Sequence, residues 1–297
     1  MRFVDLGEAV GRRSLEEACR RVGVDARSVE LIRVGTNAVF RVGRDVIGRV
    51  VLDEGNGPSV ERQVAVARWL ESVGFPANRA LAVDQPVKAD GLLVTLWESV
   101  CDGEVYAPIA DVAAVIKQLH ELRSPTGIDL PDLRPFGAET DPLPGFPGLD
   151  ENDATFLRSR IERARLEFGN LPFALPLGVI HGDANVGNVL SGKEGRPVVI
   201  DLDSFAVGPR EWDLIQTAIF YDRFGWHTAE EYRTFVDVYG YDIMTWPGYS
   251  DLADMREVAM VTWLSRKATE SGGAAAEAKK RINAMRTGGS RRDWGPY

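Results

Sequence analysis

The sequence contains few of the residues that build disulfide frameworks or metal clusters, with two cysteines, Cys19 and Cys101, and three histidines among 297 residues. So few cysteines exclude a disulfide-rich scaffold and favour a reducing, cytoplasmic location. Three widely separated histidines argue against a hydrolase that holds its metal with several imidazoles. No apolar run approaches the roughly 20 residues of a membrane-spanning helix, and the N-terminal stretch lacks the apolar core of a secretory signal. We therefore expect no association with a membrane.

The charge balance is acidic, because 44 Asp and Glu residues outnumber 35 Lys and Arg residues and leave a net charge of −9. An acidic surface repels the phosphates of nucleic acids, so we expect no nucleic-acid partner. The same charge suits a cationic small molecule, or simply keeps a protein in solution. With 44% hydrophobic and 27% charged residues, the composition is typical of a globular protein with one large domain or two lobes.

The first hundred residues alternate short β-like runs with helical patterns. Ala38–Val42 and Val46–Leu52 are rich in valine and lie on either side of a three-residue turn, which predicts a β-hairpin. Val66, Leu70 and Val73 follow at helical spacing and predict an amphipathic helix. We therefore interpret the N-terminal part as a small β-rich lobe.

After about residue 100 the pattern becomes mainly helical, with apolar stripes on both sides of a stretch dense in proline and glycine, 123–149. That stretch predicts a long loop. We predict an α+β protein with two lobes, a β-rich N-terminal lobe over 1–99 and a mainly helical C-terminal lobe over 100–297, joined by a hinge near 96–103. Small-molecule sites usually lie in the cleft of such an arrangement.

The residues that carry chemistry follow an apolar, strand-like run. His181-Gly182-Asp183 is followed five positions later by Asn188, and the apolar run Val198–Ile200 ends at Asp201. This order places oxygen-bearing side chains at the mouth of a small sheet. Carboxylate and amide oxygens suit a hard cation such as Mg²⁺, which takes few protein ligands when phosphates supply the rest. Phosphoryl transfer needs such a metal clamp together with a group that orients the nucleophile.

Together with the later segment Gly208–Asp213, these motifs resemble the aminoglycoside phosphotransferase family, whose pattern is H-G-D-x-x-x-x-N followed by I-D-x-[DE] and G-x-x-x-x-D. That family shares the protein-kinase-like fold and includes choline-kinase-like and other small-molecule kinases. The resemblance implies a Mg²⁺-dependent enzyme that moves the γ-phosphoryl group of ATP or GTP to a hydroxyl of a small polar acceptor. An aminoglycoside or amino-sugar-like molecule is the expected acceptor.

The resemblance also assigns roles to individual residues. It makes Asp183 the catalytic base, or the group that orients the acceptor hydroxyl, and it makes Asn188 and Asp201 the Mg²⁺ ligands. Asp213 resembles the structural aspartate that braces the catalytic loop. His181 is expected to support that loop through hydrogen bonds.

In the N-terminal part, Gly35, Thr36 and Asn37 resemble the family's nucleotide-covering hairpin, in which small residues let backbone N–H groups approach phosphate. The next strand carries Arg49 where the family has a lysine that contacts the α- and β-phosphates. Arginine can grip phosphate with two hydrogen bonds, but the two residues are not equivalent, so rate or nucleotide preference can differ. The helix glutamate expected to pair with Arg49 is Glu61; alternatively it is an exposed carboxylate near a helix start.

Trp97 and Glu98 end a run that resembles the strand leading to the family's hinge, where backbone groups bind the nucleobase. Backbone recognition leaves ATP and GTP both open, and Trp97 either flanks the base or belongs to the core. Asp203 either assists near the metal or is a solvated loop carboxylate. A nucleotide-binding relative without catalytic activity is the alternative function, and Arg49 in place of lysine is its only support. The oligomeric state has no signature in this sequence.

Overall fold

The computed structural model describes residues 3–35, 37–52, 57–101, 103, 105–269 and 271–296. The chain divides into two units: the first contains Met1–Pro131 and Val186–Phe205, and the second contains Asp132–Asn185 and Ala206–Tyr297. Each unit is therefore built from two separate stretches of the chain. The functional division between residues 99 and 100 stays a prediction.

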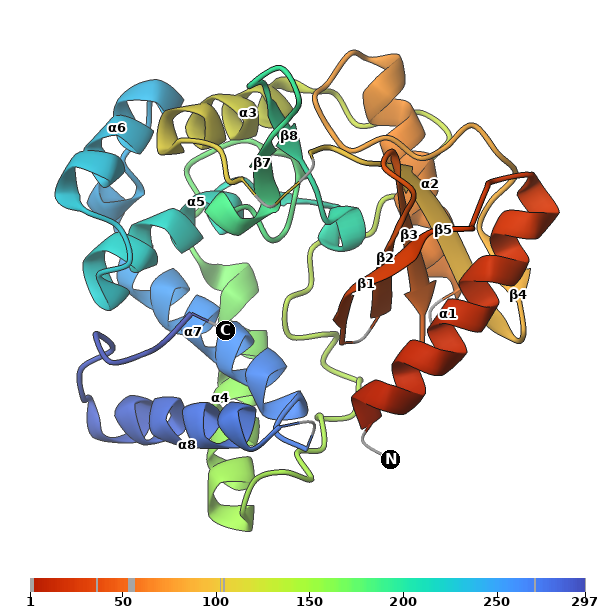
Figure 1. Ribbon diagram of the computed structural model, residues 1–297. Coiled ribbons are helices and arrows are strands. Elements are labelled where there is room, and N and C mark those ends of the chain that lie inside the picture. Colours follow the sequence, from red (N-terminus) through yellow and green to blue (C-terminus); the bar gives the residue numbers. More distant parts are fainter. Residues whose placement is uncertain are drawn as a thin grey trace. The chain divides into compact units, whose positions relative to one another are not determined.

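A five-stranded antiparallel sheet forms the centre of the first unit (Figure 1). Its strands are β1 (Val29–Val34), β2 (Asn37–Val42), β3 (Val46–Val51), β4 (Val87–Ala89) and β5 (Leu92–Glu98), in the order β1-β2-β3-β5-β4. β2 and β3 pair from Asn37 opposite Val51 to Val42 opposite Val46, so the predicted hairpin is confirmed. Successive side chains point to opposite faces of such strands, which gives the sheet an apolar face to cover.

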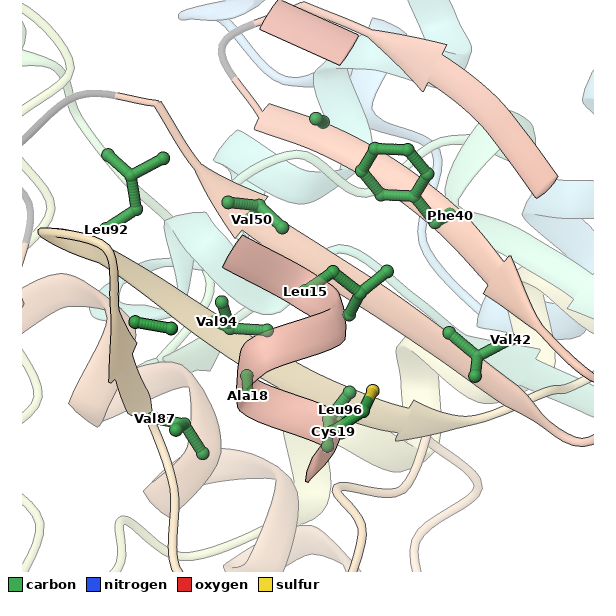
Figure 2. Close-up of a cluster of buried hydrophobic side chains, with 12 residues drawn as sticks. Leu15, Ala18, Cys19, Phe40, Val42, Val50, Val87, Leu92, Val94 and Leu96 are labelled. Atoms are coloured by element: carbon green, nitrogen blue, oxygen red, sulfur yellow. The ribbon is translucent and has the colours of Figure 1, made fainter. Parts of the chain in front are cut away.

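Helix α1 (Phe3–Val22) packs on this sheet, and its buried side chains form a core with the strands (Figure 2). Leu15, Ala18 and Cys19 of the helix cluster with Phe40 and Leu96 of the sheet, and none of the five has exposed surface. Burial raises the pKa of the Cys19 thiol to about 11. Cys19 is therefore a packing residue rather than a reactive thiol.

Two helices and a hairpin complete the first unit. They are α2 (Gly57–Ser72), α3 (Ile109–Glu121) and the antiparallel strands β7 (Val189–Ser191) and β8 (Pro197–Val199), with the 3₁₀ turns η3 (Val186–Asn188) and η4 (Leu202–Ser204). Val66 and Leu70 of α2 are buried as the apolar stripe predicted. Val73 is 48% exposed, because the helix ends at Ser72 and the chain turns away at Gly74, whose φ is +72°.

The second unit is mainly helical, as predicted for the C-terminal part. Its helices are α4 (Glu151–Glu167), α5 (Glu211–Ile219), α6 (Ala229–Tyr239), α7 (Tyr249–Arg266) and α8 (Gly272–Thr287), with the short turns η2 (Phe168–Asn170), η5 (Phe220–Phe224, π-helical) and η6 (Ile243–Thr245). α7 packs against α4, α5 and α8. Strands β6 (Leu177–Ile180) and β9 (Ala206–Pro209) pair antiparallel.

The segment 123–149 contains neither a helix nor a strand, only turns and an isolated bridge at Asp132, so the predicted long loop is confirmed. Over the described ranges, no helix combines the length and the apolar character needed to cross a membrane.

A glycine in β3, Gly48, leaves room for a side chain of α1 to pack closely on the sheet. A Cβ atom added at Gly48 would lie 2.3 Å from Leu15 Cδ1. We predict that Gly48→Ala destabilises the protein by about 1–3 kcal/mol through overpacking. In the double variant with Leu15→Ala, the loss should be smaller than the sum of the two single losses, because the shorter side chain makes room for the new methyl group. Urea unfolding of the four proteins measures this coupling, and additive losses would contradict the packing argument.

Candidate active site

A buried carboxylate holds the loop that follows β6. Asp213 lies in the first turn of α5 and has no exposed surface. Its Oδ2 accepts a hydrogen bond from the backbone N–H of His181 at 2.7 Å, and its Oδ1 accepts one from Gly182 at 2.8 Å. Gly182 has a φ of +82°, a conformation that glycine adopts at little steric cost. The predicted brace between Asp213 and the loop is confirmed.

Two further side chains fix the loop backbone. His181 is buried, and its Nδ1 accepts a hydrogen bond from the backbone N–H of Asp183 at 3.2 Å. Through this hydrogen bond His181 supports the loop backbone, as predicted. Trp212 Nε1 donates to the carbonyl oxygen of Gly182 at 2.9 Å. The side chain of Asp183 is 42% exposed, so a rigid backbone presents this carboxylate to solvent.

Sequence reasoning missed a residue that pairs with Asp183. Arg256 of α7 is 6% exposed, and its Nη2 lies 2.5 Å from Asp183 Oδ1. One signal was present in the sequence, since Arg256 lies four positions after Leu252, on the apolar side of its helix. An arginine at a core position indicates a buried partner, but the pattern does not say which residue that partner is.

In the first unit, Arg49 gathers the carboxylates that follow β8. It lies on β3 between Val39 of β2 and Thr95 of β5. Its Nη1 donates to Asp203 Oδ1 at 2.7 Å and lies 3.4 Å from Asp201 Oδ1, while Nη2 makes a second, short bond to Asp203. The sequence left the role of Asp203 open. In the structure Asp203 is the main charge partner of Arg49, through a bidentate contact.

Two amides complete the surroundings of Arg49. With its amide turned so that both groups are satisfied, Asn37 Oδ1 accepts from Arg49 Nη2 at 2.6 Å and from Nε at 2.9 Å. Gln63 of α2 places its Oε1 3.5 Å from Nη1. Glu61, the expected partner, lies two positions earlier on α2 and is exposed. Among the described contacts, the helix reaches Arg49 through Gln63 rather than Glu61, and a role of Glu61 with bound nucleotide stays a prediction.

The charges of this cluster shift the pKa values of Arg49 and Asp203. Partial burial and the negative charge of Asp201 raise the pKa of Asp203, although Arg49 opposes the shift. Burial by itself would lower the pKa of Arg49, but the charges of Asp203 and Asp201 outweigh it and raise that pKa. One cation thus faces two acids, and when both are ionised the cluster keeps a net negative charge that favours a further cation.

The β7–β8 hairpin brings Asn188 and Asp201 to the same end. Val189 pairs with Val199, and the backbone N–H of Ile200 donates to the carbonyl oxygen of Asn188 at 2.9 Å. Asp201 has φ 60° and ψ 62°, a left-handed conformation that is uncommon outside glycine and frequent at functional sites. Both side chains are half-buried oxygen donors, the chemistry that Mg²⁺ prefers.

No group of three or more His, Cys, Asp or Glu side chains within the described ranges is arranged to hold a metal ion. The residues present still fit Mg²⁺, because this ion is commonly held by one or two protein ligands together with phosphate oxygens and water. The donor set of Asn188 and Asp201 meets that requirement.

A sequence profile of the phosphotransferase enzyme family matches residues 28–257, which is most of the chain. The chain belongs to this family. The predicted resemblance is confirmed, and the protein is a small-molecule phosphotransferase. The matched range contains the Asp183 loop, the Arg49 strand and the β7–β8 hairpin.

Solved structures share the fold of this phosphotransferase over nearly its whole length. Amicoumacin kinase hAmiN, in complex with AMP-PNP, Ca²⁺ and Ami, has a TM-score of 0.71 at 12% identity, over 97% of this chain and 98% of its own. Spectinomycin phosphotransferase, in complex with ADP and spectinomycin, has a TM-score of 0.61 at 15% identity, over 91% and 93%. Choline kinase LicA from Streptococcus pneumoniae has a TM-score of 0.60 at 14% identity, over 94% and 99%. The α+β, two-lobed protein-kinase-like fold is thereby confirmed. No curated protein sequence matches this chain.

Two of the residues expected to cover the nucleotide, Gly35 and Asn37, lie after β1 and at the start of β2 of the phosphotransferase. Gly35 donates its backbone N–H to the carbonyl oxygen of Asn37 at 3.0 Å. Thr36 lies outside the described residues. The contacts of these three residues with a nucleotide stay predictions.

Trp97 and Glu98 end β5. Trp97 is 5% exposed and its Nε1 donates to Thr95 Oγ1 at 2.9 Å, so its ring is part of the core of the first unit. The Glu98 side chain is exposed, and its backbone N–H donates to the carbonyl oxygen of Arg79 at 2.9 Å. Their roles in binding a nucleobase stay predictions.

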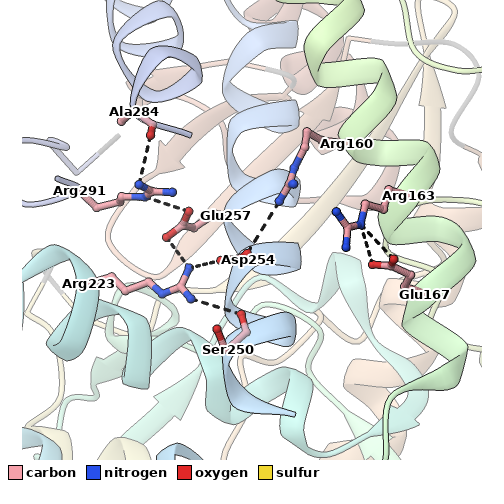
Figure 3. Close-up of polar contacts among 9 residues, drawn as sticks. All are labelled: Arg160, Arg163, Glu167, Arg223, Ser250, Asp254, Glu257, Ala284 and Arg291. Atoms are coloured by element: carbon pink, nitrogen blue, oxygen red, sulfur yellow. Dashed lines mark hydrogen bonds and ion pairs between the residues drawn. The ribbon is translucent and has the colours of Figure 1, made fainter. Parts of the chain in front are cut away.

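A charged hollow between α4 and α7 contains none of the predicted site residues (Figure 3). Arg163 Nε lies 3.0 Å from Glu167 Oε1, and Arg160 Nη2 lies 3.9 Å from Asp254 Oδ2. Exposed pairs of this kind contribute little to stability and neutralise one another. We interpret this hollow as a solvated helix surface of the phosphotransferase.

The clamp by Asp213 leads to a prediction about stability. Asp213→Asn keeps one accepting oxygen but turns an NH₂ group toward the second backbone N–H. Leaving that buried donor unpaired should lower the free energy of unfolding by about 1–3 kcal/mol. The matched control is Asp237→Asn, an exposed carboxylate on α6, which should change the stability by less than about 0.5 kcal/mol. Urea unfolding compares the two variants, and equal effects would refute the clamp.

Proposed function

We propose that this phosphotransferase transfers the γ-phosphoryl group of ATP to a hydroxyl of a small polar acceptor, aminoglycoside or amino-sugar-like, with Mg²⁺ as the metal. The observation that carries the proposal is the Asp213 clamp on the backbone of His181 and Gly182, in a chain that belongs to the phosphotransferase family. The clamp ends one residue before Asp183. Asp183, the carboxylate of this loop, therefore combines a fixed backbone with an accessible side chain.

Asp183 would accept the proton of the acceptor hydroxyl, or hold that hydroxyl in line for attack. Catalysis of phosphoryl transfer consists mainly of positioning and electrostatic stabilisation. A backbone held by a buried carboxylate, a histidine and a tryptophan meets the demand for positioning. These contacts support Asp183 as the catalytic base.

Arg49 takes the place of the phosphate-binding lysine in this proposal. Its guanidinium already makes a two-pronged contact with Asp203, and the same fork fits two phosphate oxygens. Asn188 and Asp201 would hold Mg²⁺, which when bound neutralises negative charge on the phosphate oxygens. Asp201 is also 3.4 Å from Arg49 Nη1, so both parts of the phosphate site belong to one cluster of the first unit.

The names of the structural relatives support the substrate classes. Two of them were solved with the adenine nucleotides AMP-PNP and ADP, and another phosphotransferase of this fold was solved with GDP and kanamycin, so ATP is the first donor to test and GTP stays open. Their acceptors, as named, differ among amicoumacin, spectinomycin and choline. The proposal therefore extends to the class of small polar alcohols and not to one compound.

The first experiment measures ADP or GDP release from Mg-ATP and Mg-GTP across a panel of aminoglycosides, amino sugars, peptide antibiotics, choline and homoserine-like alcohols. We predict acceptor-dependent release that Asp183→Asn and Asp201→Ala each reduce by at least about 10³-fold. Asp201→Ala should also weaken the binding of Mg-ATP, because it removes a proposed metal ligand. Asp183→Asn should leave that binding unchanged.

Turnover that survives Asp183→Asn would remove Asp183 as the base. Binding of Mg-ATP without turnover on any acceptor would instead favour the alternative, a nucleotide-binding relative without catalytic activity.

Arg49 gives a separate test of the nucleotide site. Arg49→Ala removes the guanidinium that is proposed to make two charge-assisted hydrogen bonds to phosphate. The variant should therefore bind Mg-ATP about 10- to 100-fold more weakly. Arg49→Lys keeps the charge but not the fork, so a smaller loss is expected. Arg44→Ala removes an exposed arginine of the β2–β3 turn and serves as the control. Calorimetric titration measures the three affinities, and unchanged binding by Arg49→Ala would exclude Arg49 from the site.

A further inference from the structure

The buried arginine of α7 is held by groups from two other segments of the second unit. The guanidinium of Arg256 lies 4.8 Å from the ring centroid of Trp212. Its Nη1 lies 3.3 Å from the carbonyl oxygen of Gly182, and its Nη2 bonds both Asp183 Oδ1 and Gln216 Oε1. Trp212 and Gln216 belong to α5, and both are buried. The packing of α5 against α7 therefore helps to fix the position of the guanidinium independently of its contact with Asp183.

Two acids of α7, Asp254 and Glu257, are bound to arginines other than Arg256 (Figure 3). Glu257 accepts from Arg223 Nη1 at 2.8 Å and from Arg291 Nε at 3.1 Å, and Asp254 accepts from Arg223 at 2.7 Å. Asp213, the buried acid of α5, accepts from the loop backbone. Within the described residues, the carboxylate that pairs with Arg256 is thus the one on the loop, Asp183.

A buried guanidinium is costly unless its hydrogen bonds are made, and an apolar side chain of similar volume is often as stable or more stable in its place. Packing against Trp212 alone would therefore not require an arginine at this position. What an apolar residue could not supply is a charge-assisted bond that sets the orientation of the Asp183 carboxylate. The backbone of the loop does not need this bond, because Asp213 and Trp212 already hold it.

We infer that Arg256 is a positioning residue for phosphoryl transfer, which orients the carboxylate of Asp183 toward the acceptor hydroxyl. This inference rests on the proposed role of Asp183 as the base. Arg256 itself touches neither the nucleotide nor the reacting atoms in this assignment. Its effect should therefore appear in the turnover number and not in the affinity for Mg-ATP.

The kinetic experiment measures ADP release from Mg-ATP with the acceptor panel for the native protein, Asp183→Asn, Arg256→Ala and Arg256→Lys. For Arg256→Ala we expect kcat to fall about 100-fold, as small misplacements of a catalytic group do, with KM for Mg-ATP within about threefold. Arg256→Lys should recover about tenfold of that loss, since it restores the charge without the fork. Millimolar guanidinium should also raise the activity of Arg256→Ala.

The matched control is Arg291→Ala. Arg291 also bonds α7, through Glu257, and its side chain is 18% exposed, but its contacts do not include the Asp183 loop. This variant should lose thermal stability while keeping kcat and showing no response to guanidinium. A drop in kcat shared by Arg291→Ala, or a native kcat in Arg256→Ala, would overturn the inference.

A measurement that needs no acceptor separates this inference from the proposed function. In the native protein with ¹⁵N-labelled arginine, restricted rotation should give Arg256 resolved Nη signals, identified by their loss in Arg256→Lys. Asp183→Asn should change the chemical shifts of these signals, because it removes the carboxylate charge beside Nη2, whereas Arg291→Ala should leave them in place. Signals unchanged by Asp183→Asn would show that the pair does not exist in solution, whatever the panel shows. If the signals respond as expected and Asp183→Asn keeps full turnover, the proposed role of Asp183 fails and the inference fails with it.

Discussion

The loop of the second unit depends on one buried carboxylate that accepts two adjacent backbone N–H groups. The two carboxylate oxygens of Asp213 accept the backbone N–H groups of His181 and Gly182. Asp213 lies in the first turn of α5, where the helix dipole stabilises a negative charge. Charge-assisted bonds of this kind are stronger than neutral ones. These hydrogen bonds connect the first turn of α5 to the end of β6. The backbone of the next residue, Asp183, is therefore held in place.

In each unit an arginine contacts the carboxylates of the proposed site, but the net charge of the two clusters differs. In the second unit one buried arginine, Arg256, contacts one carboxylate, Asp183, and the pair is neutral. In the first unit Arg49 contacts both Asp201 and Asp203, which leaves an excess of negative charge. A neutral pair suits a group whose orientation matters, whereas an acidic cluster suits the binding of a cation. The two arrangements therefore agree with the division of labour proposed for base and metal site.

Much of the fold and of the loop could be predicted because the relevant contacts are close in sequence or follow a periodic pattern. The β2–β3 hairpin depends on a short turn, and the contact of His181 with Asp183 spans two residues. Arg256 lies 73 positions after Asp183, and only the packing of α5 on α7 joins them. The same holds for α2, where spacing could not decide between Glu61 and Gln63 as the side chain that reaches Arg49. Periodicity predicts which face of a helix is buried, but partners across helices depend on how far each helix is rotated and shifted.

The covering of the sheet by α1 has a chemical consequence for the two thiols of the chain. Cys19 lies fully buried under the helix with a raised pKa, while Cys101 is partly exposed, three residues after the end of β5. A maleimide dye should therefore label Cys101 and not Cys19 in the native protein, within the stretch predicted to be the hinge. The chain thus carries its own attachment point for a fluorophore, without any engineered cysteine.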